Sequence, residues 1–342
     1  MKFATYEYKG TTLSGVVDGD RVWPLDRPMR QLLDAGLDQA LDLGAQAQQG
    51  QAVALNEVTL LAPLQPSTIR DFVAFEEHVE GVRRSIDGAS GVVDAWYEAP
   101  RFYFTNPYTV SGSDAVITPP AACRALDFEL EVAAVIGKSG SDVATDEAAG
   151  HIFGYTILND WSARDLQRRE MQVNLGPAKG KDFANTLGPW IVTADEIHAR
   201  RDSDGFLDIV CTVEVNGQLV GHDSLANMGW SFDALVAYAS RNSWVHPGDV
   251  LGSGTVGNGG CLAELWGRRG EQSPPPLQAG DVVTMTVEGI GTLTNTVGEP
   301  RAVPDIPVAR IVDHALMRDR HTATGSSTMD GSSAREPKGA SA

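Results

Sequence analysis

Three acidic residues alternate with apolar residues in one short segment, and they are the side chains most able to do chemistry. Asp127, Glu129 and Glu131 are each separated by one apolar residue, and an apolar run over 133–137 follows. This alternation predicts a β-strand, in which residues i and i+2 share a face, so Glu129 and Glu131 would point the same way with Asp127 behind them. Close carboxylates raise each other's pKa unless a cation lies between them, and oxygen-only ligands suit Mg²⁺, Mn²⁺ or Ca²⁺. The same pattern is typical of the solvent-exposed face of an ordinary strand, so a metal site and an ordinary strand both remain open interpretations.

A second acidic position ends another apolar stretch. Asp160 follows Tyr155–Leu158 and begins a segment that predicts a helix over 160–172. Arg164 and Gln167 are three residues apart and would share one face of that helix. Asp160 is therefore a candidate ligand beside a candidate cation, although an acidic residue at the start of a helix is also an ordinary N-cap.

A carboxylate and an imidazole recur seven residues apart near residue 75. We predict a helix over 71–84, on which Asp71 and His78 would lie on one side. Facing one pocket, they could serve as a metal ligand and a general base. The ordinary alternative is a helix cap and a surface histidine.

Four more side chains could complete a site. Lys179 and Lys181 lie in a glycine-flanked loop and could offer a cation to an anionic intermediate, although such lysines are more often solvated. Glu264 interrupts an apolar segment that we interpret as a strand, and a partly buried carboxylate there needs a partner such as a histidine. Thr255 lies in the glycine-rich loop that precedes this segment.

That glycine-rich loop spells G-x-G-x-x-G over 252–257. A dinucleotide-binding fold needs a helix directly after this motif and an acidic residue about 20 positions further on. More glycines follow here, and then a segment over 261–266 that we interpret as a strand. The context therefore argues against a nicotinamide or flavin site.

The composition restricts the kinds of partner. A net charge of −18 argues against nucleic acid and anionic membranes, and an acidic substrate would need local cations or a metal. Cys123, Cys211 and Cys261 are too widely spaced for a disulfide framework or a zinc site, which favours a reducing compartment. No secretory signal and no apolar run of about 18 residues is present, so we expect a cytoplasmic protein without a membrane span.

The predicted elements that position these residues begin with a small module over 1–60. It has short strands over 3–25, with a hairpin turn at Asp18-Gly19, and a helical stretch over 28–53. Pro63 and Pro66 mark its end.

The main domain is predicted over 61–312. It combines short strands, including a hairpin at Asn216-Gly217, with few helices, of which the third is expected over 230–241. This is an α+β pattern dominated by strands, without regular βαβ alternation. The tail over 313–342 is rich in Ser, Thr, Gly, Ala and charge, and we predict that it is disordered.

Taken together, these segments resemble the fumarylacetoacetate hydrolase family. The resemblance covers most of residues 61–312, and its motifs follow the family order: RDFVAFEEH (70–78), DFELEVAAVIGK (127–138), GYTILNDWSARDLQ (154–167), GPAKGKDF (176–183), PGDVLGSGT (247–255) and LAEL (262–265). It implies a strand-rich mixed β-roll or sandwich, a divalent cation in a cleft, and a homodimer.

The resemblance also implies roles for single residues. It makes Asp71, Glu129, Glu131 and Asp160 the metal ligands and His78 the general base, oriented by Glu264. It assigns oxyanion binding and proton delivery to Arg164, Gln167 and Lys181, with Lys179 as a competing position for Lys181. It assigns substrate contacts to Tyr103 and Thr255, and to Arg164 and Gln167 as well. Val73 stands where the family's hydrolase has a tyrosine, and the arginine for a distal carboxylate has no clear counterpart, so the substrate is expected to differ from fumarylacetoacetate.

The implied reaction is hydrolysis of a carbon–carbon bond in a β-dicarbonyl acid, such as an acylpyruvate, with water activated by His78. Mg²⁺ or Mn²⁺ is the expected cation, and Ca²⁺ is a further possibility. One alternative is a metal-dependent decarboxylase, dehydratase or isomerase of 2-oxo acids. The other is a binding protein without activity on an inherited scaffold, which the complete set of catalytic positions argues against.

Overall fold

The structure, a computed structural model, describes residues 1–313 and residue 318, apart from the side chains of residues 86 and 87. Met1–Arg301 forms one compact unit, and the chain from Ala302 onward is grouped separately. Within that second part, residues 302–313 carry no helix or strand. Nearly all of the tail predicted to be disordered, 313–342, lies outside the described residues.

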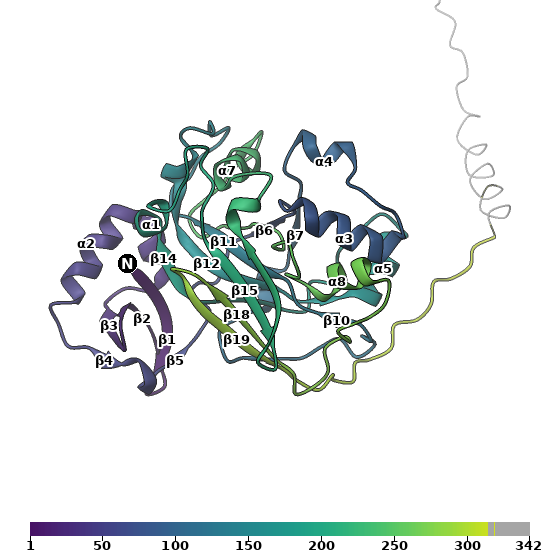
Figure 1. Cartoon of the computed structure of the whole chain (residues 1–342). Helices are drawn as coiled ribbons and strands as arrows, with labels where there is room; N and C mark the ends of the chain where they lie inside the picture. Colours follow the sequence, from purple (N-terminus) through teal and green to yellow (C-terminus); the bar gives the residue numbers. More distant parts are fainter. Residues whose placement is uncertain (314–317, 319–342) are drawn as a thin grey trace, which may run out of the picture. The chain divides into compact units, whose positions relative to one another are not determined.

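The hairpin predicted near Asp18-Gly19 is present, with Gly19 and Asp20 as its turn, and the first strands join the main sheet rather than forming one of their own. β1 pairs antiparallel with β14, with Lys2 opposite Val192, so the sheet continues from the N-terminal segment into the rest of the unit (Figure 1). The elements of this segment are β1 (Lys2–Tyr8), β2 (Thr11–Asp18), β3 (Arg21–Leu25), α1 (Met29–Ala35), α2 (Leu37–Ala47), β4 (Val53–Ala54) and β5 (Thr59–Leu60).

The main sheet has the strand order β4-β3-β2-β1-β14-β12-β11-β17-β6-β7, with β5 and β8 paired to β1 and β14. Its remaining strands are β6 (Ile69–Phe72), β7 (Phe102–Thr105), β8 (Val110–Ser111), β11 (Leu130–Ile136), β12 (Ile152–Asp160), β14 (Asn185–Thr193) and β17 (Val250–Gly252). β17 runs parallel to β6 and antiparallel to β11. This order brings three segments far apart in the sequence, around residues 71, 131 and 160, close to one another.

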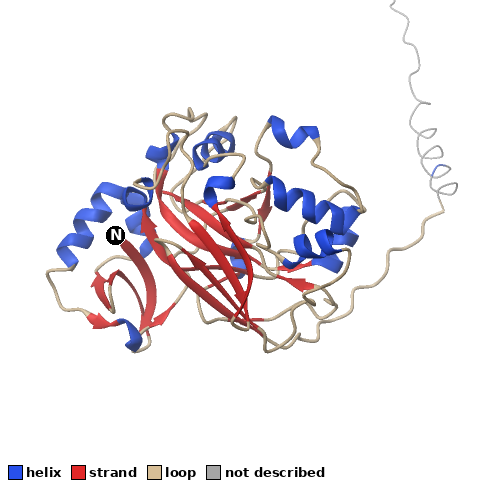
Figure 2. Ribbon diagram, in the orientation of Figure 1, coloured by secondary structure: helices blue, strands red, loops and turns tan. Residues whose placement is uncertain are grey.

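A second sheet packs over the first, as Figure 2 shows in red. Its order is β16-β15-β18-β19-β9, and its strands are β9 (Val116–Ile117), β15 (Val210–Val215), β16 (Gln218–Ser224), β18 (Val282–Val287) and β19 (Gly291–Val297). The β15–β16 turn is the predicted Asn216-Gly217 pair, in which both residues have positive φ as a two-residue hairpin requires. A short third pairing joins β10 (Leu126–Asp127) to β13 (Ser162–Ala163).

The core lies on both faces of the main sheet. Val132, Ala134 and Ile136 of β11 face the core shared with the second sheet, whereas Ala133 and Val135 face the core that contains Leu32 and Leu33 of α1. A strand covered on both faces reads as a continuous apolar run, which explains the sequence after Glu131. The strand-rich α+β architecture predicted from the sequence is thus confirmed.

The remaining helices are α3 (Glu76–Asp87), α4 (Asp94–Glu98), α5 (Arg164–Met171), α6 (Ala194–His198), α7 (Phe232–Ser240) and α8 (Leu262–Arg269). α3 and α8 pack closely (Figure 1). They approach so tightly that a Cβ built on Gly267 would lie 2.0 Å from the carbonyl oxygen of Gly81. Glycine at both positions is what allows this close approach.

Several predicted elements differ from the structure. The helix expected over 71–84 begins only at Glu76, because residues 69–72 are buried as a strand between β17 and β7. The helix expected over 160–172 begins at Arg164, because Ser162–Ala163 pairs with Leu126–Asp127. The helix expected over 230–241 is α7, as predicted.

The prediction of a strand around Glu264 is wrong, because this segment is a helix. α8 runs to Arg269 and ends at Gly270, whose positive φ suits a helix C-terminus. Four apolar-rich residues are too few to separate a strand from a buried helix by periodicity. The predicted strand through the acidic motif is likewise interrupted, since residues 128 and 129 lie between β10 and β11.

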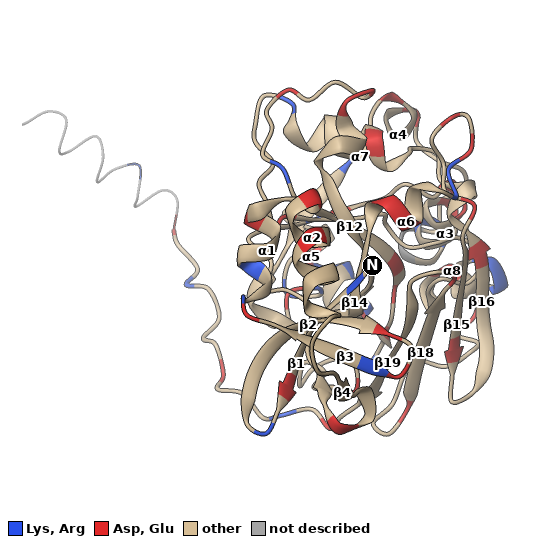
Figure 3. Cartoon of the chain, turned by 90° about the vertical axis from the view of Figure 1, so that its left-hand side faces the viewer, with Lys and Arg blue, Asp and Glu red and all other residues tan. Residues whose placement is uncertain are grey.

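Charged residues are spread over the unit. In the view of Figure 3, Lys and Arg lie at scattered positions among more numerous Asp and Glu. Within the described part of the chain, no helix is both long and apolar enough to cross a lipid bilayer.

Candidate metal centre and active site

Three buried carboxylates meet at one point. Asp71 lies on β6, Glu131 lies on β11 and Glu129 lies in the break before β11. One carboxylate oxygen from each residue lies within 4.8 Å of the others. The residues are 2%, 1% and 4% exposed, so water does not screen their mutual repulsion.

Gly252 provides the space in which two of these carboxylates meet. It lies on β17, between the strands that carry Asp71 and Glu131. A Cβ at this position would lie 2.7 Å from Oε2 of Glu131 and 2.9 Å from Oδ1 of Asp71. Two residues later, the amide of Gly254 donates a hydrogen bond of 3.1 Å to Oε2 of Glu131. The loop that does not suit a dinucleotide thus shapes the carboxylate cluster.

Asp160 lies at the end of β12 and is fixed by two partners. Lys181 donates a hydrogen bond of 2.7 Å to its Oδ2, and the hydroxyl of Tyr103 donates to the same oxygen. Lys181 also forms a buried ion pair with Glu129 and so links the two carboxylates. Asp160 is absent from the tightest cluster, but its charge helps to raise the pKa of Asp71. Lys179, the competing lysine, is exposed and pairs with Asp182.

The cluster has the properties of a site for a hard divalent cation. Burial, followed by the charge of a neighbouring carboxylate, raises the pKa values of Asp71 and Glu131 well above the usual range. Among the residues that the structure describes, Oδ1 of Asp71, Oε1 of Glu131 and Oδ1 of Asp160 are buried without a hydrogen-bond partner. Four carboxylates here share two cationic partners, and this leaves negative charge that a divalent cation would balance. The oxygen-only donor set therefore fits Mg²⁺, Mn²⁺ or Ca²⁺.

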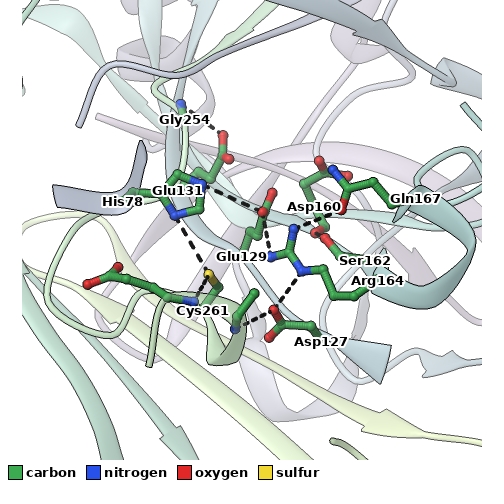
Figure 4. Close-up of polar contacts among 12 residues, drawn as sticks. His78, Asp127, Glu129, Glu131, Asp160, Ser162, Arg164, Gln167, Gly254 and Cys261 are labelled. Carbon is green, nitrogen blue, oxygen red and sulfur yellow. Dashed lines mark hydrogen bonds and ion pairs between the residues drawn. The ribbon is translucent and has the colours of Figure 1, made fainter. Parts of the chain in front are cut away.

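Arg164 connects this cluster to the helix α8. Its Nη2 donates to Oε1 of Glu129 at 2.7 Å, and its Nε donates to Oδ2 of Asp127 at 2.8 Å (Figure 4). Asp127 also accepts hydrogen bonds from the amides of Leu262 and Ala263, at 2.7 and 3.0 Å. Asp127 is therefore not a ligand of the cluster but a bridge between Arg164 and the first turn of α8.

These cations also set the charge of Glu129. Burial alone would raise its pKa, but Lys181 and Arg164 together hold the pKa of this carboxyl below its usual range. Glu129 stays ionised, which a metal ligand requires. Arg164 in turn has Gln167 as a neighbour, whose Oε1 accepts a hydrogen bond of 3.1 Å from Nη1. The predicted pairing of Arg164 and Gln167 on one helix face is thus present.

His78 faces the cluster from the first turn of α3. Its Nε2 lies 3.9 Å from Oε1 of Glu129, and the side chain is buried (Figure 4). Burial is the main cause that lowers its pKa to about 4, so the imidazole is neutral near pH 7 and can accept a proton. Asp71 and His78 do meet at one site, but from a strand and a helix rather than from one helix.

The predicted contact between Glu264 and His78 is replaced by another. Within the described residues, Oε1 of Glu264 accepts from the amide of Gly259 at 3.2 Å and pairs with Arg268 at 2.7 Å, and Oε2 is buried without a partner. Nδ1 of His78 instead lies 3.6 Å from Sγ of Cys261. Because Glu264 lies in a helix and not in a strand, its carboxylate projects differently from what the sequence suggested.

The two predicted substrate contacts have different surroundings. Tyr103 lies on β7 and its hydroxyl is bound to Asp160, so it orients a carboxylate of the cluster. Thr255 is buried in the loop after β17, beside Gly254. Two residues without a predicted role emerge here, Gly252 as the source of space and Cys261 as the neighbour of His78, and Asp127 of the acidic motif acts as a bridge. Their roles depend on contacts between distant segments, which a single sequence does not signal.

Known proteins resemble this chain in sequence and in fold. Residues 67–298 match the family described as "Fumarylacetoacetate (FAA) hydrolase C-terminal", and residues 1–63 match "Rv2993c-like, N-terminal". The chain is 30% identical over 246 residues to the oxaloacetate tautomerase YisK of Bacillus subtilis, covering 72% of this chain and 75% of the relative. It is 29% identical over 259 residues to the fumarylacetoacetase of Arabidopsis thaliana, but spans only 61% of that protein's length.

Solved structures agree with this relationship. The fumarylacetoacetate hydrolase of Exiguobacterium antarcticum matches with a TM-score of 0.69 and 26% identity, covering 87% of this chain and 99% of the other. The maleylpyruvate hydrolase of Sphingobium sp. SYK-6, solved with manganese(II) and pyruvate, matches with a TM-score of 0.65 and 22% identity, covering 88% of this chain and 100% of the other, a level that shows the fold alone. Because the first family description covers more than half of the sequence, the chain belongs to the fumarylacetoacetate hydrolase family.

Proposed function

We propose that this chain is a divalent-metal-dependent hydrolase that cleaves a carbon–carbon bond in a 2,4-dioxo acid, such as an acylpyruvate. One arrangement carries the proposal. A neutral imidazole, His78, and two buried cations, Arg164 and Lys181, all surround Glu129 beside carboxylate oxygens that lack a partner. Relatives of this chain include a fumarylacetoacetase, an oxaloacetate tautomerase and a 2-hydroxyhepta-2,4-diene-1,7-dioate isomerase, so the reaction class is an inference from this chain's own residues.

Asp71, Glu129, Glu131 and Asp160 would hold the cation. We expect Mg²⁺ or Mn²⁺ there, with Ca²⁺ as a further candidate, and manganese accompanies pyruvate in the structural neighbour described above. Bound there, a divalent ion would act as a Lewis acid that polarises the dicarbonyl oxygens of the substrate.

The protein's residues would handle the protons and the charge. His78 takes a proton from water through Nε2, because its neutral form persists well below pH 7. Arg164 and Lys181 are fixed cations in a site without bulk water, where they stabilise an oxyanion on the attacked carbonyl carbon. Gln167 holds Nη1 of Arg164 in place. Lys181, which is protonated and bound to Glu129 and Asp160, would return a proton to the departing enolate and be reprotonated from His78.

A second reaction is favoured by a specific observation. The neighbour of Nδ1 in His78 is a thiol and not a carboxylate, so the conjugate acid of the base gains little stabilisation. A neutral imidazole without a charged partner can also move a proton between carbon and oxygen, as tautomerisation or isomerisation of a 2-oxo acid requires. The similarity to an oxaloacetate tautomerase supports the same alternative.

A substrate panel separates the two. Purified protein is assayed with fumarylpyruvate, acetylpyruvate, fumarylacetoacetate and oxaloacetate, in Mg²⁺ or Mn²⁺ and in EDTA, with products separated by chromatography. Hydrolysis predicts metal-dependent loss of diketone absorbance and two acid products in equal amounts. Enol–keto conversion of oxaloacetate without any cleavage product would replace the hydrolase proposal with the tautomerase one. The His78→Ala variant controls for a contaminating activity.

A further inference from the structure

The thiol of Cys261 lies between the first turns of α3 and α8. Its Sγ is 3.6 Å from Nδ1 of His78, and it accepts a hydrogen bond of 3.4 Å from the amide of Glu264 as the N-cap of α8. Cys261 is fully buried, and His78 is 6% exposed. Figure 4 shows the imidazole between Cys261 on one side and Glu129 on the other.

The sulfur cannot easily move away from the imidazole. α3 and α8 touch through Gly81 and Gly267, and Asp127 holds the amides of Leu262 and Ala263 directly after Cys261. The carboxylate that could have replaced it, Glu264, is engaged by Gly259 and Arg268. Within the described residues, Cys261 is thus the hydrogen-bonding neighbour of Nδ1.

The hydrogen bond at Nδ1 decides what Nε2 can do. A neutral imidazole carries one proton, and the partner of one nitrogen determines which nitrogen holds it. A ring N–H is a stronger donor than a thiol, which is a weak donor and a weak acceptor. A proton on Nε2 would form no comparable hydrogen bond, because the neighbouring Oε1 of Glu129 lies 3.9 Å away, beyond hydrogen-bond distance. The proton is therefore favoured on Nδ1.

We propose that Cys261 is a positioning residue for His78: its sulfur accepts the Nδ1–H hydrogen bond and so presents an unprotonated Nε2 to Glu129 and the carboxylate cluster. The catalytic consequence rests on the proposed function, whereas the tautomer itself does not. The competing interpretation is that Cys261 only fills space and caps α8, as buried cysteines commonly do.

Nitrogen NMR of the histidine side chains tests this directly, because the shifts of the two ring nitrogens distinguish the tautomers. The full-length protein is labelled at its 7 histidines and measured near neutral pH, in EDTA and with Mg²⁺, and His78→Gln identifies the signal of His78. We expect wild-type His78 to be protonated at Nδ1. Protonation at Nε2 in the wild type would overturn the proposal without any further variant.

The Cys261→Ala variant then tests whether the sulfur determines the tautomer of His78. We expect its His78 signals to shift toward a mixture of the two tautomers, whereas Ser231→Ala, which removes the N-cap of α7 away from His78, should leave them unchanged. Unchanged nitrogen shifts in Cys261→Ala would reduce Cys261 to a space-filling residue. If the alanine variant does not fold, Cys261→Val, which fills the space but accepts no hydrogen bond, is measured in its place with the same expected shift.

Kinetics separates this inference from the proposed function. With a dioxo acid that the wild type cleaves, Cys261→Ala should lower kcat about 10–100-fold with KM unchanged, since orienting residues around a metal site typically matter by that factor. If no dioxo acid is cleaved, the proposed function fails while the NMR result still decides the role of Cys261. An unchanged kcat alongside an altered tautomer would show that the hydrogen bond does not serve catalysis.

Discussion

Nε2 of His78 lies 3.9 Å from Oε1 of Glu129, and this approach joins the helix α3 to the carboxylate cluster of the main sheet. Burial leaves the imidazole neutral, whereas two buried cations keep the carboxylate ionised. One side chain is therefore able to accept a proton and the other to bind a cation, at the same place.

The first prediction concerns Glu131 as a ligand. Glu131→Gln should abolish stoichiometric binding of Mg²⁺ or Mn²⁺, because it removes a charged donor from a buried site. In EDTA the same variant should melt at a higher temperature than the wild type, since it also relieves repulsion with Asp71. Calorimetric titration and thermal unfolding measure both effects. Glu288→Gln, at an exposed ion pair, is the matched control, and retained metal binding in Glu131→Gln would contradict the ligand assignment.

The second prediction concerns His78 as the base. His78→Ala should lower kcat by about 10²–10⁴, the usual contribution of a general base, while metal binding persists. Steady-state kinetics and metal titration are compared with those of His222→Ala, which changes an exposed histidine of β16. Near-wild-type turnover in His78→Ala would remove His78 from the mechanism.

The third prediction concerns the space that Gly252 leaves. Gly252→Ala should fold, because the nearest atoms are ends of the side chains of Asp71, Glu131 and Leu158, which can turn aside. Turning the two carboxylates displaces them from the cation. We expect the metal affinity to fall by about 10–100-fold. Gly150→Ala, where a Cβ meets nothing within 4 Å, is the control. Equal affinities in the two variants would mean that the cation lies elsewhere.

The fourth prediction concerns Asp127 as a bridge. Asp127→Asn replaces a carboxylate that accepts from Arg164 and two amides of α8, and leaves a buried guanidinium with one partner fewer. Removing one side of a buried ion pair typically lowers the free energy of unfolding by about 3–5 kcal/mol. Urea unfolding measures this, with the exposed Asp208→Asn as control. A loss within the error of the control would show that Asp127 supports neither α8 nor Arg164.

The fifth prediction concerns pH. Burial raises the pKa of Glu264 to about 7, above the ordinary value for an unfolded chain. Because the folded pKa is the higher one, stability is greatest below the unfolded pKa and falls as pH rises through about 7. Glu264→Gln cannot ionise, so its free energy of unfolding should improve relative to the wild type by about 2–3 kcal/mol from about pH 5 to about pH 8.

Denaturant unfolding across this range measures the difference. Glu80→Gln, which changes an exposed carboxylate of α3, should show no such trend. A constant difference between Glu264→Gln and the wild type at every pH would contradict the effect of burial on Glu264.

Local patterns in the sequence were enough to predict the elements whose conformation depends on residues nearby in the chain. The Asn216-Gly217 hairpin needs positive φ at two positions, and few residues tolerate it, so the turn is visible in the sequence. Asp160 at the end of an apolar strand was also placed correctly. In these cases the hydrophobic pattern and the turn residues agree with the fold.

Elements set by distant partners could not be predicted in this way. Residues 69–72 form a strand because β17 and β7 flank them, although the polar residues that follow suggested a longer helix. The contact between His78 and Cys261 joins residues 183 apart, and the space at Gly252 exists only once three strands are assembled. Such contacts follow from tertiary packing and leave no local signal.

The central claim is that water, activated at this site, cleaves a carbon–carbon bond. Cleavage of an acylpyruvate in isotopically labelled water, with Mn²⁺ present, tests it most directly, with mass spectrometry of both acid products. The account predicts one labelled oxygen in the carboxylate released from the acyl half, in amounts equal to the pyruvate formed, and no products in EDTA. Conversion between enol and keto forms without a labelled acid would contradict it and identify the chain as a tautomerase.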